Sequence, residues 1–303
     1  MSAAIFAFAE TAKQAAALAD NIGLEARIVE TRSFPDGESL VRIPATAPTA
    51  LLFRSLNDPN AKLVEILLAA SALRDGGAQR VVLVAPYLAY MRQDMAFHPG
   101  EAVSQRVMGR LLTDHFDGLV TIDPHLHRVT DLGEVFRGMP ALAVSAAPAL
   151  AQAIAGGLDP STILVGPDSE SRPWVESIAR PLGLEVLVGE KVRKGDRDVM
   201  LTVPGIEVAR GRPAILVDDL ISSGTTLLAC AALLREAGAT GVEAIASHSL
   251  ASAADLERLR AGGIERIRAS DSIPGTVGTI PLAGVLSEAI IGLGRSEGWL
   301  GSE

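Results

Sequence analysis

Carboxylates, hydroxyls and a glycine follow one apolar segment in the second half of the chain. Residues 214–226 are AILVDDLISSGTT, in which a buried strand expected at Ala214–Val217 leads into Asp218, Asp219 and a polar loop. The remaining candidate ligands in this segment are Ser222, Ser223, Gly224, Thr225 and Thr226. A helical pattern starts at Thr225, so the loop lies at a helix N-terminus, where unpaired N–H groups and the helix dipole favour an anion.

The loop composition therefore predicts a phosphate site. Gly224 lets the backbone approach a phosphate without a Cβ in the way, and the hydroxyls add donors. Asp218 and Asp219 would repel an anion, so we expect sugar hydroxyls or a magnesium ion between them and the phosphate. The alternative is an ordinary helix N-cap that follows two solvated aspartates.

Two loops of the first half have side chains that suit a nucleotide. Arg92, Gln93 and Asp94 come after the strand expected at Arg80–Ala85 and offer a cation, an amide and a carboxylate. Asp36 and Glu38 lie in a helix-breaking segment and can accept hydrogen bonds from a ribose or a base. Either segment alone is also compatible with a polar surface loop.

Further candidates follow other expected strands. His125 and His127 lie two residues apart in a turn after Gly118–Ile122, and this spacing allows one imidazole to reach a metal or a phosphate while the other points away. Asp168 follows the strand expected at Ile163–Gly166. The segment 189–197 has Lys191, Arg193 and two further cations after the strand expected at Glu185–Val188. Such a run is either a solvated face or an arm that closes over a polyphosphate.

Composition excludes several classes of protein. The formal net charge of −9 disfavours general nucleic-acid binding, and we expect neither a nucleic-acid partner nor a membrane partner. The single cysteine, Cys230, lies in an alanine- and leucine-rich helical segment, which excludes a disulfide framework and favours a reducing cytoplasm.

Short β-branched segments alternate with alanine-rich helical patterns over most of the 303 residues. This alternation predicts an α/β fold with mainly parallel sheets flanked by helices. A linker-like segment at 137–145 suggests a boundary near residue 142, with about five strands on each side. We therefore expect domains at 1–142 and 143–284, followed by a C-terminal helix and tail at 285–303 that packs back on the first domain. Ligands of parallel sheets bind beyond the carboxyl ends of the strands, where all these motifs lie.

Together, the motifs resemble the ribose-phosphate pyrophosphokinase family over about residues 5–292. The resemblance rests on Phe34–Glu38, Arg92–Asp94, Asp123–His125, Pro167–Asp168, Lys191–Arg193 and Val217–Thr226, taken in their order and spacing. It implies two phosphoribosyltransferase-like domains, with ATP on the first and ribose 5-phosphate on the second. It also implies Mg²⁺ as cofactor and transfer of the β,γ-diphosphate of ATP to the C1 hydroxyl of ribose 5-phosphate, which releases AMP.

The resemblance assigns a role to each motif. Phe34, Asp36 and Glu38 would hold adenine, and Arg92, Gln93 and Asp94 would lie on the ATP side. His125 and Asp168 would hold magnesium, and Asp218 and Asp219 the ribose hydroxyls. Residues 222–226 would bind the 5-phosphate, and Lys191 and Arg193 would be catalytic, by neutralising the charge that develops on the transferred group.

Some residues depart from the family pattern. Ser222 and Thr225 stand where the usual loop has a carboxylate and a glycine, and Pro124 replaces a leucine of the metal turn. The segment 97–102 resembles the archaeal-like subgroup, and we expect a homo-oligomer, a dimer or larger. Two alternatives remain open at this stage: a catalytically silent paralogue with a regulatory role, and a type I phosphoribosyltransferase.

Overall fold

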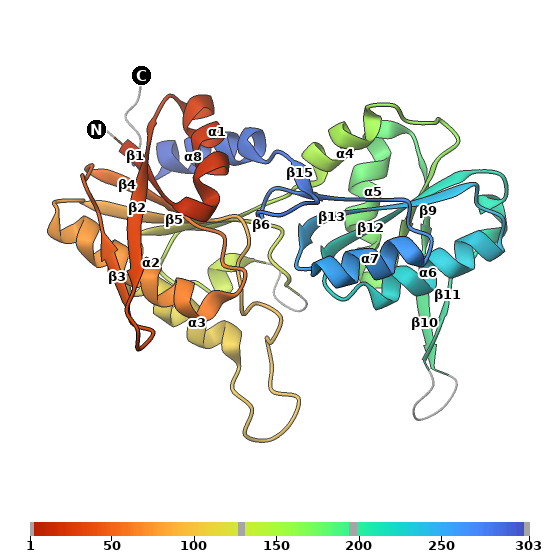
Figure 1. Cartoon of the computed structure of the whole chain (residues 1–303), viewed down its shortest axis with the longest axis horizontal. Helices are drawn as coiled ribbons and strands as arrows, with labels where there is room; N and C mark the ends of the chain where they lie inside the picture. Colours follow the sequence, from red (N-terminus) through yellow and green to blue (C-terminus); the bar gives the residue numbers. More distant parts are fainter. Residues whose placement is uncertain (1–2, 127–130, 194–198, 300–303) are drawn as a thin grey trace. The chain divides into compact units, whose positions relative to one another are not determined.

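Two compact units make up the chain in the computed structural model, which describes residues 3–126, 131–193 and 199–299 (Figure 1). Unit 1 comprises residues 1–145 and 281–303, and unit 2 comprises 146–280. The expected boundary at residue 142 falls inside a strand, β7 (Ala141–Val144), which takes the place of the expected linker. Since three of its four residues are only half-buried and two are alanines, its sequence does not carry a strong strand signal.

Unit 1 is built on a seven-stranded sheet of order β3-β2-β1-β4-β5-β6-β7. All neighbouring strands are parallel except β2 and β3, which form an antiparallel hairpin at one edge. Besides β7, the strands are β1 (Ala3–Phe8), β2 (Glu25–Ser33), β3 (Ser39–Arg42), β4 (Thr49–Phe53), β5 (Arg80–Ala85) and β6 (Gly118–Ile122). The central strands β1, β4, β5 and β6 are buried almost throughout, which explains their continuous apolar sequences.

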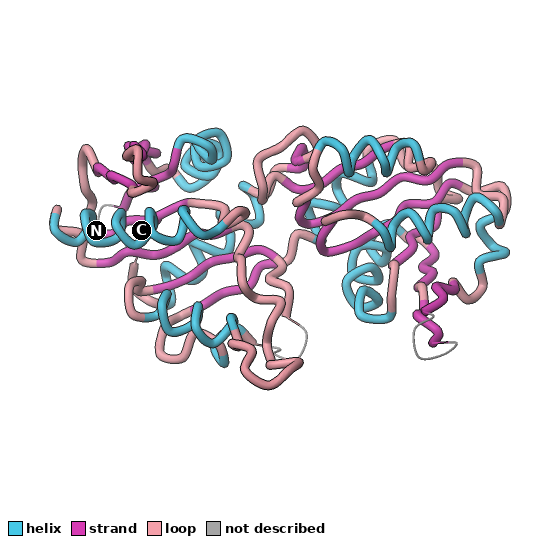
Figure 2. The backbone as a smooth tube through the Cα atoms, turned by 60° about the horizontal axis from the view of Figure 1, so that its bottom comes forward, coloured by secondary structure: helices cyan, strands magenta, loops and turns pink. Residues whose placement is uncertain are grey.

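Helices cover both faces of this sheet (Figures 1 and 2). The helices of unit 1 are α1 (Ala12–Ile22), α2 (Pro59–Asp75), α3 (Ser104–Thr113) and α8 (Ala283–Ser296). The C-terminal α8 packs against α1, and Trp299 beyond it is buried against Gly118 of β6. Helix α8 and Trp299 are therefore part of the first unit, although unit 2 separates them from the rest of unit 1 in sequence.

Unit 2 has a six-stranded parallel sheet of order β15-β14-β13-β12-β8-β9 and a separate hairpin, β10-β11. The sheet strands are β8 (Ile163–Gly166), β9 (Glu185–Val188), β12 (Pro213–Ile221), β13 (Gly241–Ser249), β14 (Arg266–Ser270) and β15 (Gly278–Ile280). The hairpin strands are β10 (Glu190–Arg193) and β11 (Val199–Thr202), and the helices are α4 (Ala147–Ala155), α5 (Arg172–Ala179), α6 (Thr225–Glu236) and α7 (Ala253–Ala261). None of the helices in the described ranges is long and apolar enough to span a bilayer.

The predicted fold class is confirmed: each unit has a mainly parallel sheet between helices. Five short strands were not predicted, namely β3, β7, β10, β11 and β15, none of which has more than four residues. They lie at sheet edges or in the isolated hairpin, where burial does not impose an apolar pattern. The predicted strand at Ala214–Val217 continues further, to Ile221.

Candidate functional site

The acidic pair of unit 2 lies within a strand rather than in a loop. Strand β12 lies between β8 and β13, and its pairing with β13 extends through Asp218 to Ile221. Asp218 and Asp219 are half-buried, and the Asp219 N–H donates to Asp218 Oδ1 over 2.9 Å. The extra pairing holds both carboxylates on a rigid element at the carboxyl end of the sheet, where ligands of such folds bind.

Asp168 lies near this pair, because it follows β8 and β8 is the neighbour of β12. Its carboxylate accepts a hydrogen bond from the Ser171 N–H over 3.3 Å, which starts a short helical turn. Burial, and after it the charges of Asp219 and Asp168, raise the pKa of Asp218 from 3.8 to about 8. Oxygen ligands with this much mutual repulsion suit a hard cation or hydroxyl donors.

The predicted phosphate loop connects β12 to α6. Ser222, Ser223 and Thr225 are exposed, and Ser223 Oγ lies 3.2 Å from Thr225 Oγ1. Gly224 is the N-cap of α6 and has φ +73°. Because glycine has no side chain, the first N–H groups of the helix have no capping side chain to which they can donate. Arg258 of α7 donates to the Ser223 carbonyl and so connects the loop to α7.

The hairpin that carries Lys191 and Arg193 starts beside Gly166 and Pro167, the two residues before Asp168. The Gly189 N–H donates to the Gly166 carbonyl over 2.8 Å, and a Cβ at Gly189 would lie 2.6 Å from the Pro167 carbonyl oxygen. Strand β10 follows directly and pairs with β11, Lys191 opposite Leu201 and Arg193 opposite Val199. The side chains of Lys191 and Arg193 lie outside the described residues. The backbone nevertheless shows that the predicted arm is an antiparallel hairpin.

The Arg92 loop of unit 1 is held by the N-terminus of α3. Ser104 Oγ donates to the Tyr90 carbonyl over 3.1 Å, and the Gln105 N–H donates to the Gln93 carbonyl over 3.3 Å. Arg92 is exposed and Gln93 half-buried, whereas Asp94 is only 9% exposed and faces a pocket beside α3. Arg92 and Gln93 are thus presented outward while Asp94 points inward.

The other nucleotide loop is the turn of the β2-β3 hairpin. The Phe34 N–H donates to the Glu38 carbonyl over 2.7 Å, and the Arg32 guanidinium stacks on the Phe34 ring at 4.8 Å. Asp36 and Glu38 are exposed at the tip. Because β1 and β4 separate β2 from β5, and no hydrogen bond or ion pair joins the two loops in the described chain, unit 1 does not bring Phe34 and Arg92 together.

The predicted magnesium ligands belong to different units. His125 is half-buried in the turn after β6, and Asp168 lies in unit 2. No group of three or more His, Cys, Asp or Glu side chains among the described residues could hold a metal ion. The Asp168 carboxylate still fits a magnesium ion, because this ion usually binds a protein through only one or two carboxylates and takes its other ligands from water and phosphate oxygens.

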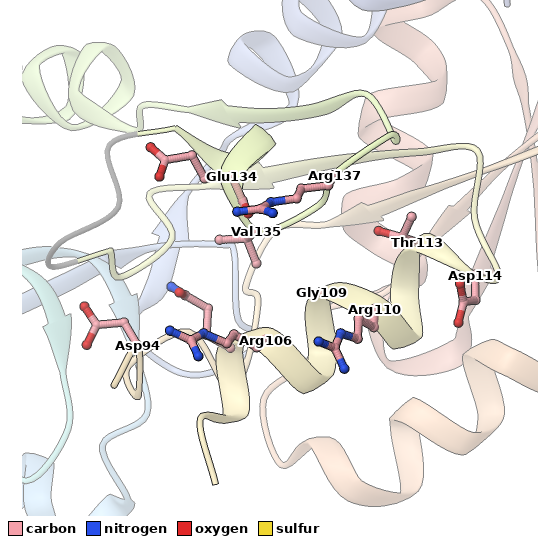
Figure 3. A pocket seen from close by; sticks show the side chains of 10 residues that line it. Asp94, Arg106, Gly109, Arg110, Thr113, Asp114, Glu134, Val135 and Arg137 are labelled. Atoms are coloured by element: carbon pink, nitrogen blue, oxygen red, sulfur yellow. The ribbon is translucent and has the colours of Figure 1, made fainter. Parts of the chain in front are cut away.

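Two features of unit 1 were not predicted from the sequence. Arg54, at the end of β4, is 5% exposed, forms ion pairs with Glu10 at 2.8 Å and Glu65 at 2.6 Å, and stacks on Phe8 at 3.7 Å. A charged residue directly after a buried strand was the only sequence signal. The second feature is an arginine-lined pocket beside α3 (Figure 3), which Arg106 and Arg110, spaced four residues apart, could have indicated.

Comparisons with known proteins match both units. The N-terminal domain of ribose phosphate pyrophosphokinase matches residues 3–115, and the phosphoribosyl transferase domain matches residues 140–269. Ribose-phosphate pyrophosphokinase of Methanopyrus kandleri is 33% identical over 94% of this chain and 98% of its own length. The Halobacterium salinarum protein of the same name is 32% identical over 91% of this chain and 96% of its own length.

A solved structure agrees with these matches. Phosphoribosylpyrophosphate synthetase from Mycobacterium smegmatis superposes with a TM-score of 0.82 at 26% identity, and the alignment covers 98% of this chain and all of that one. The matched sequences and the matched structure extend over both units. The chain therefore belongs to the ribose-phosphate pyrophosphokinase family.

Proposed function

We propose that the protein is a ribose-phosphate diphosphokinase, which transfers the β,γ-diphosphate of ATP to the C1 hydroxyl of ribose 5-phosphate and releases AMP. The single observation that carries this proposal is the family membership over nearly the full length, with both domains present. The site of unit 2 supports it, because an acidic pair on β12 leads directly into an uncapped helix N-terminus.

Ribose 5-phosphate binds to unit 2 in this proposal. Its phosphate accepts hydrogen bonds from the N–H groups and hydroxyls of Ser222, Ser223, Gly224, Thr225 and Thr226. Asp218 and Asp219 accept hydrogen bonds from the ribose hydroxyls, which fixes the C1 hydroxyl for attack. Burial and the neighbouring carboxylates raise the pKa of Asp218, and hydrogen bonds from the ribose hydroxyls would stabilise its charged form.

ATP is proposed to bind to the loops of unit 1. Arg92 and Gln93 are presented to solvent by the N-terminus of α3 and suit the phosphates. Asp94 is buried, so its proposed part in ATP binding is to hold the loop. Phe34, Asp36 and Glu38 are proposed for adenine, with the Phe34 ring as a stacking surface, and since the sheet separates them from Arg92 they need not serve the same bound nucleotide.

Magnesium would neutralise the charge of the phosphate groups and orient them. Asp168 and His125 are the residues proposed to hold it, Asp168 by a carboxylate oxygen that already lies near Asp218. Lys191 and Arg193 are proposed to balance the negative charge that develops on the transferred diphosphate and on the oxygen that leaves with AMP. The short β10-β11 hairpin supports this role, since it follows Gly189, which lies next to Pro167, the residue before Asp168.

We also propose that the protein is cytoplasmic and forms a homo-oligomer. The substrates and the use of a single cysteine, Cys230, in 303 residues favour the cytoplasm. Large apolar side chains are exposed on β2, β3 and α2, namely Ile28, Leu40, Val64 and Leu68, which favours a homo-oligomer. Light scattering on the purified chain would measure its mass in solution.

A transfer assay with ATP labelled in the γ-phosphate tests the activity. We expect AMP to form only when ribose 5-phosphate and magnesium are both present, and the label to appear on the sugar. Lys191→Ala and Arg193→Ala should each lower turnover by about 10²-fold or more, whereas Arg172→Ala, an exposed arginine on α5, should not. Binding of ATP without AMP formation, unchanged by Lys191→Ala, would instead indicate a silent paralogue.

A further inference from the structure

Helix α7 contacts the loop at 222–226 through two consecutive residues. It lies beside α6, the helix that follows the loop (Figure 1). Arg258 donates to the Ser223 carbonyl, and the buried Leu259 occupies the space that a Cβ at Gly224 would need. The contacts of α7 therefore fall on both residues of a single peptide group, the one that joins Ser223 to Gly224.

The Arg258 guanidinium is itself fixed at the start of α7. The nitrogen that meets the Ser223 carbonyl, Nη2, also lies 2.8 Å from Asp255 Oδ1. Asp255 Oδ2 accepts hydrogen bonds from the N–H and the hydroxyl of Ser252, at 3.0 and 2.6 Å. Ser252 Oγ in turn accepts from the Asp255 N–H over 3.1 Å, which completes a capping box. The donor to the loop is thus anchored on a capped helix end.

The orientation of the Ser223–Gly224 peptide decides whether it attracts or repels an anion. In a trans peptide group the carbonyl and the following N–H point in opposite directions, and none of the described peptide bonds is cis. Because the Ser223 carbonyl points to Arg258, the Gly224 N–H points away from it. This N–H has no acceptor among the described residues, so it is available to a phosphate.

The backbone of residue 224 does not enforce this orientation. A flip of the peptide plane changes ψ of residue 223 and φ of Gly224, and glycine adopts positive and negative φ about equally well. The observed φ of +73° is therefore one of two states open to it. In the flipped state the Ser223 carbonyl would replace the Gly224 N–H and face a phosphate with its negative oxygen. The hydrogen bond from Arg258 selects the state that binds an anion.

We propose that Arg258 is a positioning residue for ribose 5-phosphate, which holds the Ser223–Gly224 peptide with its N–H toward the 5-phosphate. This role rests on the proposed function, because the loop at 222–226 must be the one that binds this phosphate. Arg258 needs no contact with the ligand, since its guanidinium already has two partners, Asp255 and the Ser223 carbonyl. If its loss makes the flipped state about nine times as populated as the other, the apparent Kd rises about tenfold.

Calorimetric titration of ribose 5-phosphate into the full chain, without ATP, tests this role. Arg258→Ala should raise this Kd about tenfold, while the Kd for ATP and the melting temperature should change little. Arg258→Lys keeps a donor for the carbonyl but loses the fork that also engages Asp255, so it should give a smaller rise. Arg260→Ala is the matched control, because it removes an exposed arginine of the same helix whose side chain has no partner in the described chain.

Asp255→Asn separates positioning from charge. This substitution removes a negative charge close to the loop, so it would tighten binding if Arg258 attracted the phosphate by its charge alone. If Arg258 must hold the peptide, the loss of its anchor weakens binding, and we expect Kd to rise. Tighter binding by Asp255→Asn, or equal Kd values for Arg258→Ala and Arg260→Ala, would overturn the proposal.

The titration does not depend on turnover, so its outcome is separate from that of the AMP assay. If ribose 5-phosphate binds but no AMP forms, the diphosphokinase activity is refuted, and the Kd values of the variants still decide the role of Arg258. If the unchanged protein does not bind ribose 5-phosphate, the proposed site and the role of Arg258 are both refuted.

Discussion

Asp168, at the end of β8, lies close enough to Asp218, on the neighbouring β12, for its negative charge to contribute to the raised pKa of Asp218. Burial of Asp218 is the larger cause, followed by the charge of Asp219. Three carboxylates are thus brought together by strands that are about 50 residues apart in sequence but adjacent in the sheet.

The raised pKa predicts how stability depends on pH. Between 3.8 and about 8, the folded protein keeps a proton on Asp218 that the unfolded chain has released, so the free energy of unfolding falls as pH rises through this range. Asp218→Asn has no such proton and should lose less stability between about pH 5 and about pH 8. Thermal unfolding without metal or substrate would measure the difference.

Glu257→Gln, which neutralises an exposed carboxylate on α7, is the control for this experiment. It should follow the unchanged protein at both pH values. Equal pH dependence of the unchanged protein and Asp218→Asn would show that Asp218 ionises normally.

Gly189→Ala should displace the base of the β10-β11 hairpin, because the new Cβ would lie 2.6 Å from the Pro167 carbonyl oxygen. Since catalytic groups must be placed to within a fraction of an ångström, we expect turnover to fall by about tenfold or more. Gly156→Ala adds the same methyl group where no atom lies within 4 Å and should leave turnover unchanged. Steady-state AMP formation, together with the melting temperature, would separate misplacement from unfolding.

Gly224→Ala should weaken ribose 5-phosphate binding in particular. The residue has φ +73°, and its Cβ would lie 2.6 Å from a methyl group of Leu259, which is fully buried. The left-handed backbone alone costs a non-glycine residue about 1 kcal/mol, and the contact adds to this. We expect KM for ribose 5-phosphate to rise about tenfold while KM for ATP stays the same. A parallel rise in both constants would argue for general unfolding instead.

Trp299 and Gly118 should be energetically coupled. The indole is 4% exposed and covers Gly118, and the Trp299 carbonyl accepts a hydrogen bond from Thr49 Oγ1 over 3.1 Å. Trp299→Ala should cost about 3–5 kcal/mol of stability. Gly118→Ala should be strongly destabilising alone and nearly neutral when combined with Trp299→Ala. Denaturant unfolding of the four variants of this cycle would measure the coupling, and additive effects would exclude the contact.

The sequence alone determined the fold class and the order of the motifs. The apolar strands β5 and β6 were predicted at their observed bounds, because burial on both faces of a parallel sheet forces a continuous apolar sequence. The β12 loop was predicted as a phosphate site, because glycine and hydroxyls before a helix are a local signal. The family resemblance was confirmed by the full-length relatives.

Only the tertiary structure decided which of these residues are neighbours. The proximity of Asp168 to Asp218 depends on strand order, and the inward position of Asp94 depends on the packing of α3, neither of which is a local property of the sequence. The ion pairs of Arg54 join segments that are distant in sequence, and so does the approach of Arg137 to Arg106 and Arg110 of α3. Local patterns fix elements, whereas burial and charge at a site arise from long-range packing.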